Sequence, residues 1–375
     1  MLNLSQNGCD VWVASSTELA LTPTAVALGK FDGIHLGHQK VIQPVLESVR
    51  GRLMPEDRKI AEWENGENLG ECSSHVTANL APTTSTKEHI YTTVVTFHPH
   101  PQEFFTGKPR TLLTPLDEKV QQLRSLGMEQ LVLLPFDREL SALSPEDFVK
   151  KILVEQLQCH SISVGQDFCF GKKRMGTAND LQQLAAKYDI PVTIVPLQTD
   201  ASNLSTTSNE VDNQHLEETR ISTSFIRQTL EEGNIQKANS LLGRPYTLTG
   251  LVVPGQKLGR TIGFPTANLQ LPKDKFIPRH GVYAVRVLIL SQTQNTQPIQ
   301  KLGVMNIGNR PTVSGTHTSV EIHLFDYSGD LYSQKLVVEL VKFLRPEQKF
   351  SSLEELKTQI QLDCTVAKEV LSATC

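Results

Sequence analysis

The sequence predicts two domains, a doubly wound α/β domain followed by a small antiparallel β-barrel that a C-terminal helix closes. Between residues 25 and 195, short apolar runs alternate with helical spacing, which is typical of a parallel sheet with crossover helices. After Leu242-Gly-Arg-Pro-Tyr246 the pattern changes to short alternating strands separated by turns. The 375 residues suffice for two cores, and we expect domains at 10–240 and 241–375.

Composition argues against several functional classes. The formal net charge is −4 and the pI about 6.3, whereas nucleic-acid-binding proteins usually carry a basic excess. No apolar run approaches the length of a membrane span, and the N-terminus lacks the features of a signal peptide. The six cysteines have neither C-x-x-C nor zinc spacing, which indicates free thiols. We therefore expect a soluble cytoplasmic protein that binds neither nucleic acid nor membranes; its self-association cannot be inferred from the sequence.

The first strand, turn and helix contain the most distinctive stretch, A-V-A-L-G-K-F-D-G-I-H-L-G-H-Q at residues 25–39. An apolar run predicts a buried strand, and Gly29 and Gly33 bracket a tight turn. Because His35 and His38 are three residues apart, they project from one face of the first helical turn. Backbone N–H groups and the helix dipole favour an anion there, and histidines can donate hydrogen bonds to a phosphoryl group. The alternative is two ordinary histidines at a helix start.

Two later strands also end in candidate ligand-binding residues. A buried strand at 91–96 leads into Phe97-His-Pro-His-Pro101, and a strand at 161–164 leads into Gly165-Gln-Asp-Phe168. Ligands of open parallel sheets bind at the carboxyl ends of strands, although a rigid proline turn and core aromatics would explain the same residues. The other expected elements here are an edge strand at 11–13, helices at 34–50, 116–126, 145–157 and 181–187, and strands at 131–134 and 192–195.

Polar segments at 61–89 and 198–219 contain few large apolar residues and are expected to be an exposed insertion and a loop. The second segment leads into I-S-T-S-F-I-R at 221–227. Ser222 or Thr223 would cap the next helix and offer hydroxyl and N–H groups to phosphates, with Arg227 beside them. Capping alone would also explain the two hydroxyl residues.

A loop rich in glycine and proline opens the second half, after a strand at 246–253. Such a loop exposes backbone amides and can surround a polyphosphate; its residues include Gly259, Arg260, Gly263 and Pro265. Thr266 and Asn268 are hard oxygen donors that point the same way in an extended segment. With phosphate oxygens they could hold Mg²⁺, although a plain turn is the alternative.

The remaining elements contain one candidate base. In the strand at 319–326, Glu321 and His323 share one face and the apolar residues share the other. A carboxylate there could accept the proton of an attacking hydroxyl, or it could simply face solvent. Further strands are expected at 281–287 and at 337–344, the latter followed by Arg345, and a helix at 353–370 would pack across the barrel.

These motifs, in this order, resemble the bacterial bifunctional riboflavin kinase/FAD synthetases over residues 10–370. G-K-F-D-G-I-H-L-G-H is similar to the H-x-G-H nucleotidyltransferase motif, and T-F-H-P-H-P, G-Q-D-F-C-F-G and I-S-T-S-F-I-R are similar to other stretches of the synthetase half. G-R-T-I-G-F-P-T-A-N, N-I-G-N-R-P-T and V-E-I-H-L-F-D resemble the riboflavin kinase signature. The polar insertion at 61–89, and Ser333 where the family usually has glycine, depart from the pattern.

The resemblance implies an H-x-G-H type α/β domain, a six-stranded barrel and two reactions. ATP and Mg²⁺ would convert riboflavin to FMN, and a second ATP would donate AMP to FMN, giving FAD and pyrophosphate. Glu321 would be the kinase base, with Thr266 and Asn268 on the metal. His35 and His38 would stabilise the α-phosphoryl group. The implied ATP-binding residues are Gly29, Phe31, Asp32, Gly33, Ser222, Thr223, Arg227, Gly259, Arg260, Gly263 and Pro265. The implied flavin-binding residues are His98, Pro99, Pro101, Gly165, Asp167, Phe168 and Arg345.

The sequence leaves three alternatives open. The chain could retain only one of the two activities, or it could be a non-catalytic flavin-binding protein. A different H-x-G-H transferase would account for the first half but not for G-F-P-T-A-N.

Overall fold

The computed structural model describes residues 11–50, 89–199, 220–255, 258–290, 297–312 and 315–373. The polar segments expected at 61–89 and 198–219 lie almost wholly outside these residues. By their contacts the described residues form two units, which we call the sheet unit and the barrel unit. The sheet unit lies within Met1–Lys30, Lys40–Pro101 and Leu123–Pro196, and the barrel unit lies within Phe31–Gln39, Gln102–Gln122 and Leu197–Cys375.

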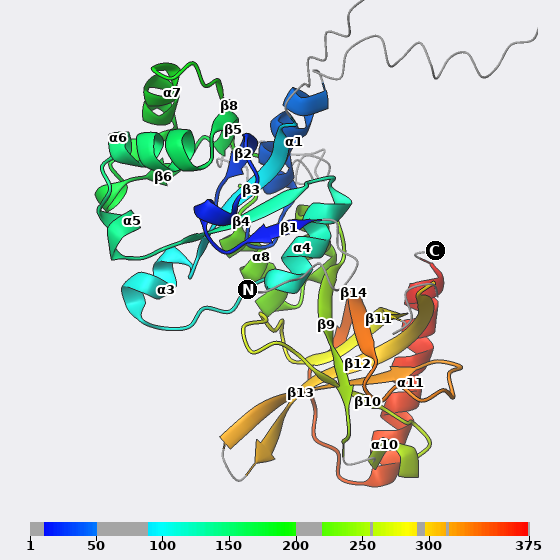
Figure 1. The fold of residues 1–375 in the computed structure, drawn as a ribbon. Helices are drawn as coiled ribbons and strands as arrows, with labels where there is room; N and C mark the ends of the chain where they lie inside the picture. The colour runs from blue at the N-terminus through cyan, green and yellow to red at the C-terminus, as the bar shows by residue number, and fades with distance from the viewer. Residues whose placement is uncertain are drawn as a thin grey trace, which may run out of the picture. The chain divides into compact units, whose positions relative to one another are not determined.

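The sheet unit is built on six parallel strands (Figure 1), in the order β1-β4-β3-β2-β5-β8. The strands are β1 (Trp12–Ala14), β2 (Thr24–Leu28), β3 (Tyr91–His98), β4 (Gln130–Pro135), β5 (Cys159–Gly165) and β8 (Val192–Val195). Because β2 lies between β3 and β5, the chain runs outward from β2 in both directions, and the switch point falls at β2 and β5. This confirms the doubly wound α/β fold.

Helices and short turns connect these strands. They are η2 (Thr17–Leu19), α1 (Leu36–Arg50), α3 (Pro101–Thr106), α4 (Leu116–Ser125), α5 (Arg138–Ala142), α6 (Pro145–Asp147), the π-helical η3 (Phe148–Gln156), η4 (Lys172–Arg174) and α7 (Ala178–Ala186). A two-stranded hairpin, β6 (Cys169–Phe170) and β7 (Gly176–Thr177), precedes α7. The single helix expected at 145–157 is therefore a short α-helical turn continued by a π-helix. Its buried residues Phe148, Ile152 and Leu153 pack into the core of the sheet unit.

The barrel unit contains a closed barrel of six antiparallel strands, in the order β10-β13-β12-β11-β14-β9. The strands are β9 (Tyr246–Val253), β10 (Ala267–Gln270), β11 (Gly281–Leu290), β12 (Ile299–Thr312), β13 (Gly315–Leu324) and β14 (Lys335–Arg345). On β13, Val320, Ile322 and Leu324 are buried inside the barrel, as the alternation of the sequence predicts. The six-stranded barrel implied by the resemblance is confirmed.

Four more helices lie wholly in the barrel unit, which also contains most of α3 and α4. They are α8 (Thr223–Glu232), α9 (Ile235–Leu242), the one-turn α10 (Leu258–Thr261) and α11 (Leu353–Ser372). Helix α11 lies along the barrel (Figure 1) and packs on β11, β12 and β14. Its Ala367 and Leu371 are buried against Ala284 and Val304 of the barrel, and this confirms the closing helix.

Candidate active sites

The turn after β2 is stabilised by a segment 81 residues further along the chain. Asp32 is only 3% exposed, and its carboxylate accepts hydrogen bonds from the backbone N–H groups of Leu113 (2.7 Å) and Thr114 (3.3 Å). The N–H of Gly33 donates to Thr114 Oγ1 at 2.9 Å. Gly33 has φ +94°, and a Cβ there would lie 2.9 Å from Leu113 Cδ1, so a side chain would be strained on both counts. Asp32, implied to be an ATP-binding residue, makes bonds that shape the turn itself.

The start of α8 contacts the same turn. Ser222 caps the helix by accepting from Phe225 N at 3.2 Å, whereas Thr223 Oγ1 donates to Asp32 O at 3.0 Å. Arg227 Nη2 donates to Asp32 Oδ2 at 2.8 Å and to Thr111 O at 2.5 Å. The three residues that the sequence assigned to phosphate are thus next to the H-x-G-H turn, although two of them also contact Asp32.

The two histidines lie face to face. The rings of His35 and His38 stack with centroids 3.7 Å apart, and the backbone N–H of His38 donates to His35 Nδ1 at 3.3 Å. Nδ1 of His35 therefore carries the lone pair, and a neutral His35 would have its proton on Nε2. A Cβ at Gly37 would lie 3.1 Å from His35 Nδ1, so the glycine of the motif leaves room for this ring.

His38 is poised to remain neutral. Burial, followed by the charges of His35 and Lys119, lowers its pKa well below the usual range of a histidine. Its Nδ1 is buried and has no hydrogen-bond partner among the described residues. A buried polar atom is rarely left unpaired in a folded protein, and this one is available to a ligand.

Cations surround the turn. Loss of solvent lowers the pKa of the buried Lys119 and of the half-buried Arg110, and Asp32 opposes that shift in each. Arg227 adds a third positive charge beside Asp32, while Asp274 is a second carboxylate that acts on Lys119. More positive than negative charge in a partly buried place favours a polyphosphate. Lys119 and Arg110 lie outside every motif that the sequence presents, and neither was predicted.

In the sheet unit, the candidate flavin residues follow β3 and β5, the two strands that flank β2. His98 is the last residue of β3, while Pro101 is the first residue of α3, so the extended proline segment is shorter than expected. Gly165 ends β5, and Asp167 after it is exposed. The ring of Phe168 stacks on that of Phe170 with centroids 5.8 Å apart. Phe170 is in the core, whereas Phe168 is half-buried. The choice between a core residue and a ligand contact is therefore resolved for Phe170 only.

A second cluster lies on the barrel. Asn268 of β10 pairs in register with Glu321 of β13, and Thr266 Oγ1 donates to Glu321 Oε2 at 3.3 Å. His323, on the same face as Glu321, hydrogen-bonds through Nδ1 with Pro265 O at 2.9 Å. The structure therefore brings together the three residues predicted for kinase chemistry.

The loop before β10 folds closely around this cluster. A Cβ at Gly255 would lie 2.1 Å from Asn268 Nδ2, and one at Gly259 would lie 2.2 Å from Phe264 O. Gly263 has φ +89°, and Phe264 N donates to Gly259 O at 2.8 Å. Arg260 is in α10, a helical turn that the sequence did not predict in this loop. Glycines here allow backbone and Asn268 to approach one another as no other residue would.

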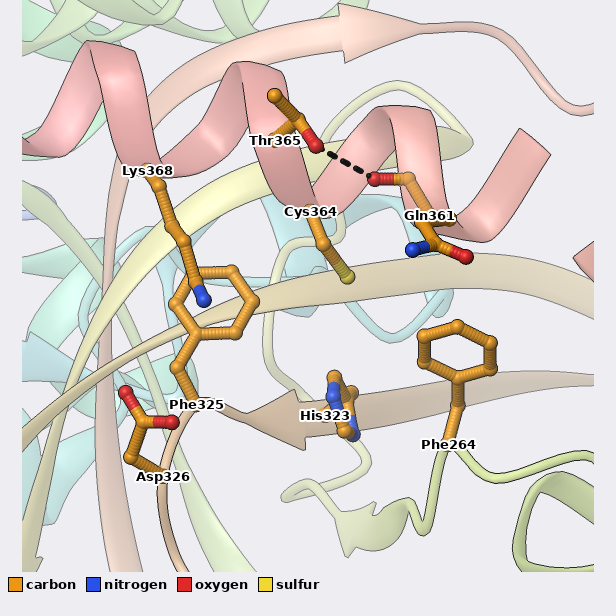
Figure 2. Close-up of a pocket in the computed structure, with 8 residues that line it drawn as sticks. All are labelled: Phe264, His323, Phe325, Asp326, Gln361, Cys364, Thr365 and Lys368. Carbon is orange, nitrogen blue, oxygen red and sulfur yellow. Dashed lines mark hydrogen bonds between the residues drawn. The ribbon is translucent and has the colours of Figure 1, made fainter. Parts of the chain in front are cut away.

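A pocket of about 270 Å³ opens beside the cluster, between the barrel and α11 (Figure 2). Its aromatic wall is formed by Phe264, His323 and Phe325, with the His323 ring 5.5 Å from Phe264 and edge-on to it. The volume is near the lower end of small-molecule sites, roughly 300 Å³. The other lining residues are Asp326, Gln361, Cys364, Thr365 and Lys368.

Sequence reasoning missed the α11 side of this pocket. Gln361, Cys364, Thr365 and Lys368 follow the spacing of one helix face, and Figure 2 shows them on the turns of α11 nearest the aromatic residues. That spacing was visible, but only as one face of an amphipathic helix. Arg345, predicted to bind flavin, forms a two-point ion pair with Asp363, at 2.9 Å from Nε to Oδ1 and 2.7 Å from Nη2 to Oδ2. Its role with flavin stays a prediction.

Known proteins identify both halves. The FAD synthetase family model matches residues 18–55 and 77–209, and the riboflavin kinase family model matches residues 242–371. The bifunctional riboflavin kinase/FMN adenylyltransferase of Escherichia coli K12 is 35% identical over 350 residues, 93% of each chain. That of Bacillus subtilis 168 is 33% identical over 345 residues, 91% of this chain and 90% of the relative. The chain belongs to the bifunctional riboflavin kinase/FMN adenylyltransferase family.

The bifunctional interpretation of the sequence is thereby confirmed. The enzyme uses ATP to phosphorylate riboflavin and to adenylylate FMN, so riboflavin, FMN, ATP and FAD are its ligands. A solved structure described as a macrolide-efflux protein from Streptococcus pneumoniae has the same fold, with a TM-score of 0.70 and 27% identity, covering 94% of this chain and 97% of that one. Within the described residues, no helix is long and apolar enough to cross a membrane.

Proposed function

We propose that Glu321, Thr266 and Asn268 form the kinase centre and that the turn containing His35 and His38 forms the adenylyl-transfer centre. For the kinase centre, the observation that carries the proposal is the 3.3 Å contact from Thr266 Oγ1 to Glu321 Oε2, with Asn268 in register opposite Glu321.

In the kinase centre, Glu321 accepts the proton of the 5′-hydroxyl of riboflavin. The freed oxygen forms a bond to the γ-phosphorus of ATP while the bond from that phosphorus to the β,γ-bridging oxygen breaks, and ADP leaves. Backbone N–H groups of the loop that contains Gly259 and Gly263 surround the phosphates.

A magnesium ion fits the donors of this centre. The hydroxyl of Thr266 and the amide oxygen of Asn268 are hard ligands, and the close approach of Gly255 to Asn268 fixes the amide. Mg²⁺ bound there would neutralise phosphate charge. The protein's own contribution is to orient Glu321, which is in contact with Thr266.

The pocket beside His323 is the proposed site of the flavin ring in this half. Flat aromatic walls suit a planar ring, and His323 is two residues from Glu321 on the same face of β13. The ribityl chain would then run from the pocket to the base. In the sheet unit, the proposed FMN contacts are His98, Pro99, Pro101, Gly165, Asp167 and Phe168.

In the adenylyl-transfer centre, a phosphate oxygen of FMN forms a bond to the α-phosphorus of ATP, and the bond to the leaving pyrophosphate breaks. His35 and neutral His38 donate hydrogen bonds to the α-phosphoryl group as its charge rises. Ser222, Thr223 and Arg227 are next to the same turn and would bind the departing phosphates.

The test measures both reactions on one sample. Wild type, Glu321→Gln and His38→Asn are each incubated with ATP and MgCl₂ and either riboflavin or FMN, and the flavins are separated by chromatography. We expect Glu321→Gln to stop FMN formation but still convert added FMN to FAD, and His38→Asn to accumulate FMN without FAD. If either variant keeps the reaction assigned to its residue, that assignment is wrong. The domain boundary at residue 240 and the cytoplasmic location stay predictions from the sequence.

A further inference from the structure

A lysine of the barrel is wholly buried and unused by the kinase chemistry. Lys275 lies in the loop between β10 and β11, and its side chain has 0% exposure. Its ammonium donates to Leu113 O at 2.7 Å and to Glu118 Oε2 at 2.5 Å, and lies 4.4 Å from the centroid of the Tyr246 ring. All four residues belong to the barrel unit, although 157 positions separate Lys275 from Glu118.

Burying this ion pair costs free energy, because both charges are removed from water. Burial lowers the pKa of Lys275 and raises that of Glu118, and each residue's charge opposes the shift of the other. An apolar pair of similar volume would often be as stable as a buried ion pair, so the charges are better explained by the geometry that they impose.

The geometry imposed is that of the segment before α4. Leu112 N donates to Asp274 O at 2.5 Å, and Phe276 N donates to Leu112 O at 2.8 Å, so the segment runs beside the lysine loop. The next two residues, Leu113 and Thr114, donate the backbone hydrogen bonds that Asp32 accepts. A chain of direct contacts thus leads from Lys275 to the turn.

The other side of Gly33 is bound from the barrel as well. While its N–H donates to Thr114, its carbonyl oxygen accepts from Arg244 Nη2 at 2.8 Å. Gln39 Nε2 donates to Leu242 O and to Ile34 O, both at 3.1 Å. Arg244 and Lys275 both lie in the part of the chain that matches riboflavin kinase.

We propose that Lys275, with Arg244, is a positioning residue for adenylyl transfer, so that residues of the kinase half hold the H-x-G-H turn in its reactive geometry. This rests on the proposed role of His35 and His38. The kinase reaction should not depend on Lys275 or Arg244, because the kinase centre is at the other end of β9. Asn268 pairs with Val253, seven residues from Tyr246, which is about 23 Å at a rise of about 3.3 Å per residue.

The test uses four variants: Lys275→Met, which leaves Glu118 buried without its lysine partner; Lys275→Met combined with Glu118→Gln, which removes both charges of the pair; Lys275→Arg; and His38→Asn. For each, kcat and KM are measured for FAD formation from FMN and for FMN formation from riboflavin, together with the melting temperature. We expect the double variant to melt close to wild type, yet to lose at least tenfold in kcat for FAD formation while FMN formation stays within twofold. Lys275→Arg, which keeps a cation, should recover part of the lost kcat.

The outcomes separate the two proposals. If the double variant forms FAD at the wild-type rate while His38→Asn does not, the positioning role of Lys275 is wrong. If both reactions fall in parallel with the melting temperature, the residue is merely structural and the proposal is overturned. If His38→Asn keeps FAD formation, the proposed centre itself is wrong. Should Lys275→Met fail to fold, the double variant carries the test, since both members of the buried pair are neutral in it.

Discussion

The two proposed centres differ in how their residues are brought together. In the kinase centre, Asn268 and Glu321 lie opposite one another on paired strands, and Thr266 directly precedes β10, so the register of the barrel sets their geometry. The H-x-G-H turn is instead held by side-chain contacts from segments around residues 113, 227 and 244. Strand register rests on many backbone bonds, whereas a few long-range contacts can each be lost to one substitution. The adenylyl centre should therefore be the more fragile of the two.

The largest difference between the losses of the two activities is expected when Asp32 is replaced by alanine. Two buried backbone donors and Arg227 would lose their acceptor, and breaking a buried ion pair costs about 3–5 kcal/mol of stability. A misplaced turn would lower kcat for FAD formation by about 10²-fold or more. Kinase activity should change little, because among the described residues the side chain of Asp32 bonds to Leu113, Thr114 and Arg227 and to none of the proposed kinase residues.

Asp180→Ala is the matched control for that substitution. Asp180 also accepts a backbone hydrogen bond, from Thr177 N at 2.9 Å in the capping box of α7, and it belongs to the sheet unit. Rates and melting temperatures of the two variants are compared. Equal losses of FAD formation in both would remove any special role for Asp32.

Asn268→Ala should have the opposite selectivity to Asp32→Ala, because it should impair FMN formation. Loss of a proposed metal ligand should raise the Mg²⁺ concentration for half-maximal FMN formation by at least roughly tenfold, since even outer-shell partners of a metal matter that much. Gln270→Ala, two residues along the same strand and exposed, is the control. Titrations with MgCl₂ measure the shift. An unchanged Mg²⁺ dependence in Asn268→Ala would contradict the metal assignment.

The contribution of the H-x-G-H turn to stability should depend on pH through His38. Because the pKa of His38 is lowered on folding, the unfolded chain binds a proton below about pH 6.5 that the folded chain does not. Stability from this residue is present above pH 6.5 and is lost as the pH falls, by about 1.4 kcal/mol per unit until the folded pKa is reached. Urea midpoints of wild type and His38→Asn at pH 7.5, 6.5 and 5.5 measure the effect. The two should converge as the pH falls, and a constant difference would show that His38 is not buried as a neutral ring.

How far the sequence predicted each centre follows from the same contrast. Glu321 and His323 could be placed on one face because strand alternation is local, and Thr266 and Asn268 because they share an extended segment. The wall of α11 behind the pocket could not be assigned, since a helix face shows which residues cluster but not what they meet.

At the turn, the local sequence pattern predicted the two histidines but not the contacts that hold the turn in place. Nothing near Asp32 in the sequence indicates that Leu113 and Thr114 bind it, and nothing near Lys275 indicates Glu118. Such contacts arise from tertiary packing between segments, which no periodicity encodes. The strand-turn-helix fold of the motif was therefore predictable, while the residues that fix its geometry were not.

The smallest effect concerns the pocket beside His323, the proposed flavin site, where a substitution should alter the affinity for riboflavin and leave kcat nearly unchanged. Burial, with Asp363 nearby, raises the pKa of Cys364 to about 11, so the thiol is neutral near pH 7 and contributes packing. Cys364→Leu should fill part of the 270 Å³ pocket and raise KM for riboflavin about fivefold, close to 1 kcal/mol, with kcat nearly unchanged. Val366→Leu, more exposed on the same helix, is the control. Steady-state kinetics with riboflavin and then with FMN provide the readout. An unchanged KM would place the ring elsewhere, whereas an equal rise in KM for FMN adenylylation would mean that α11 serves both reactions.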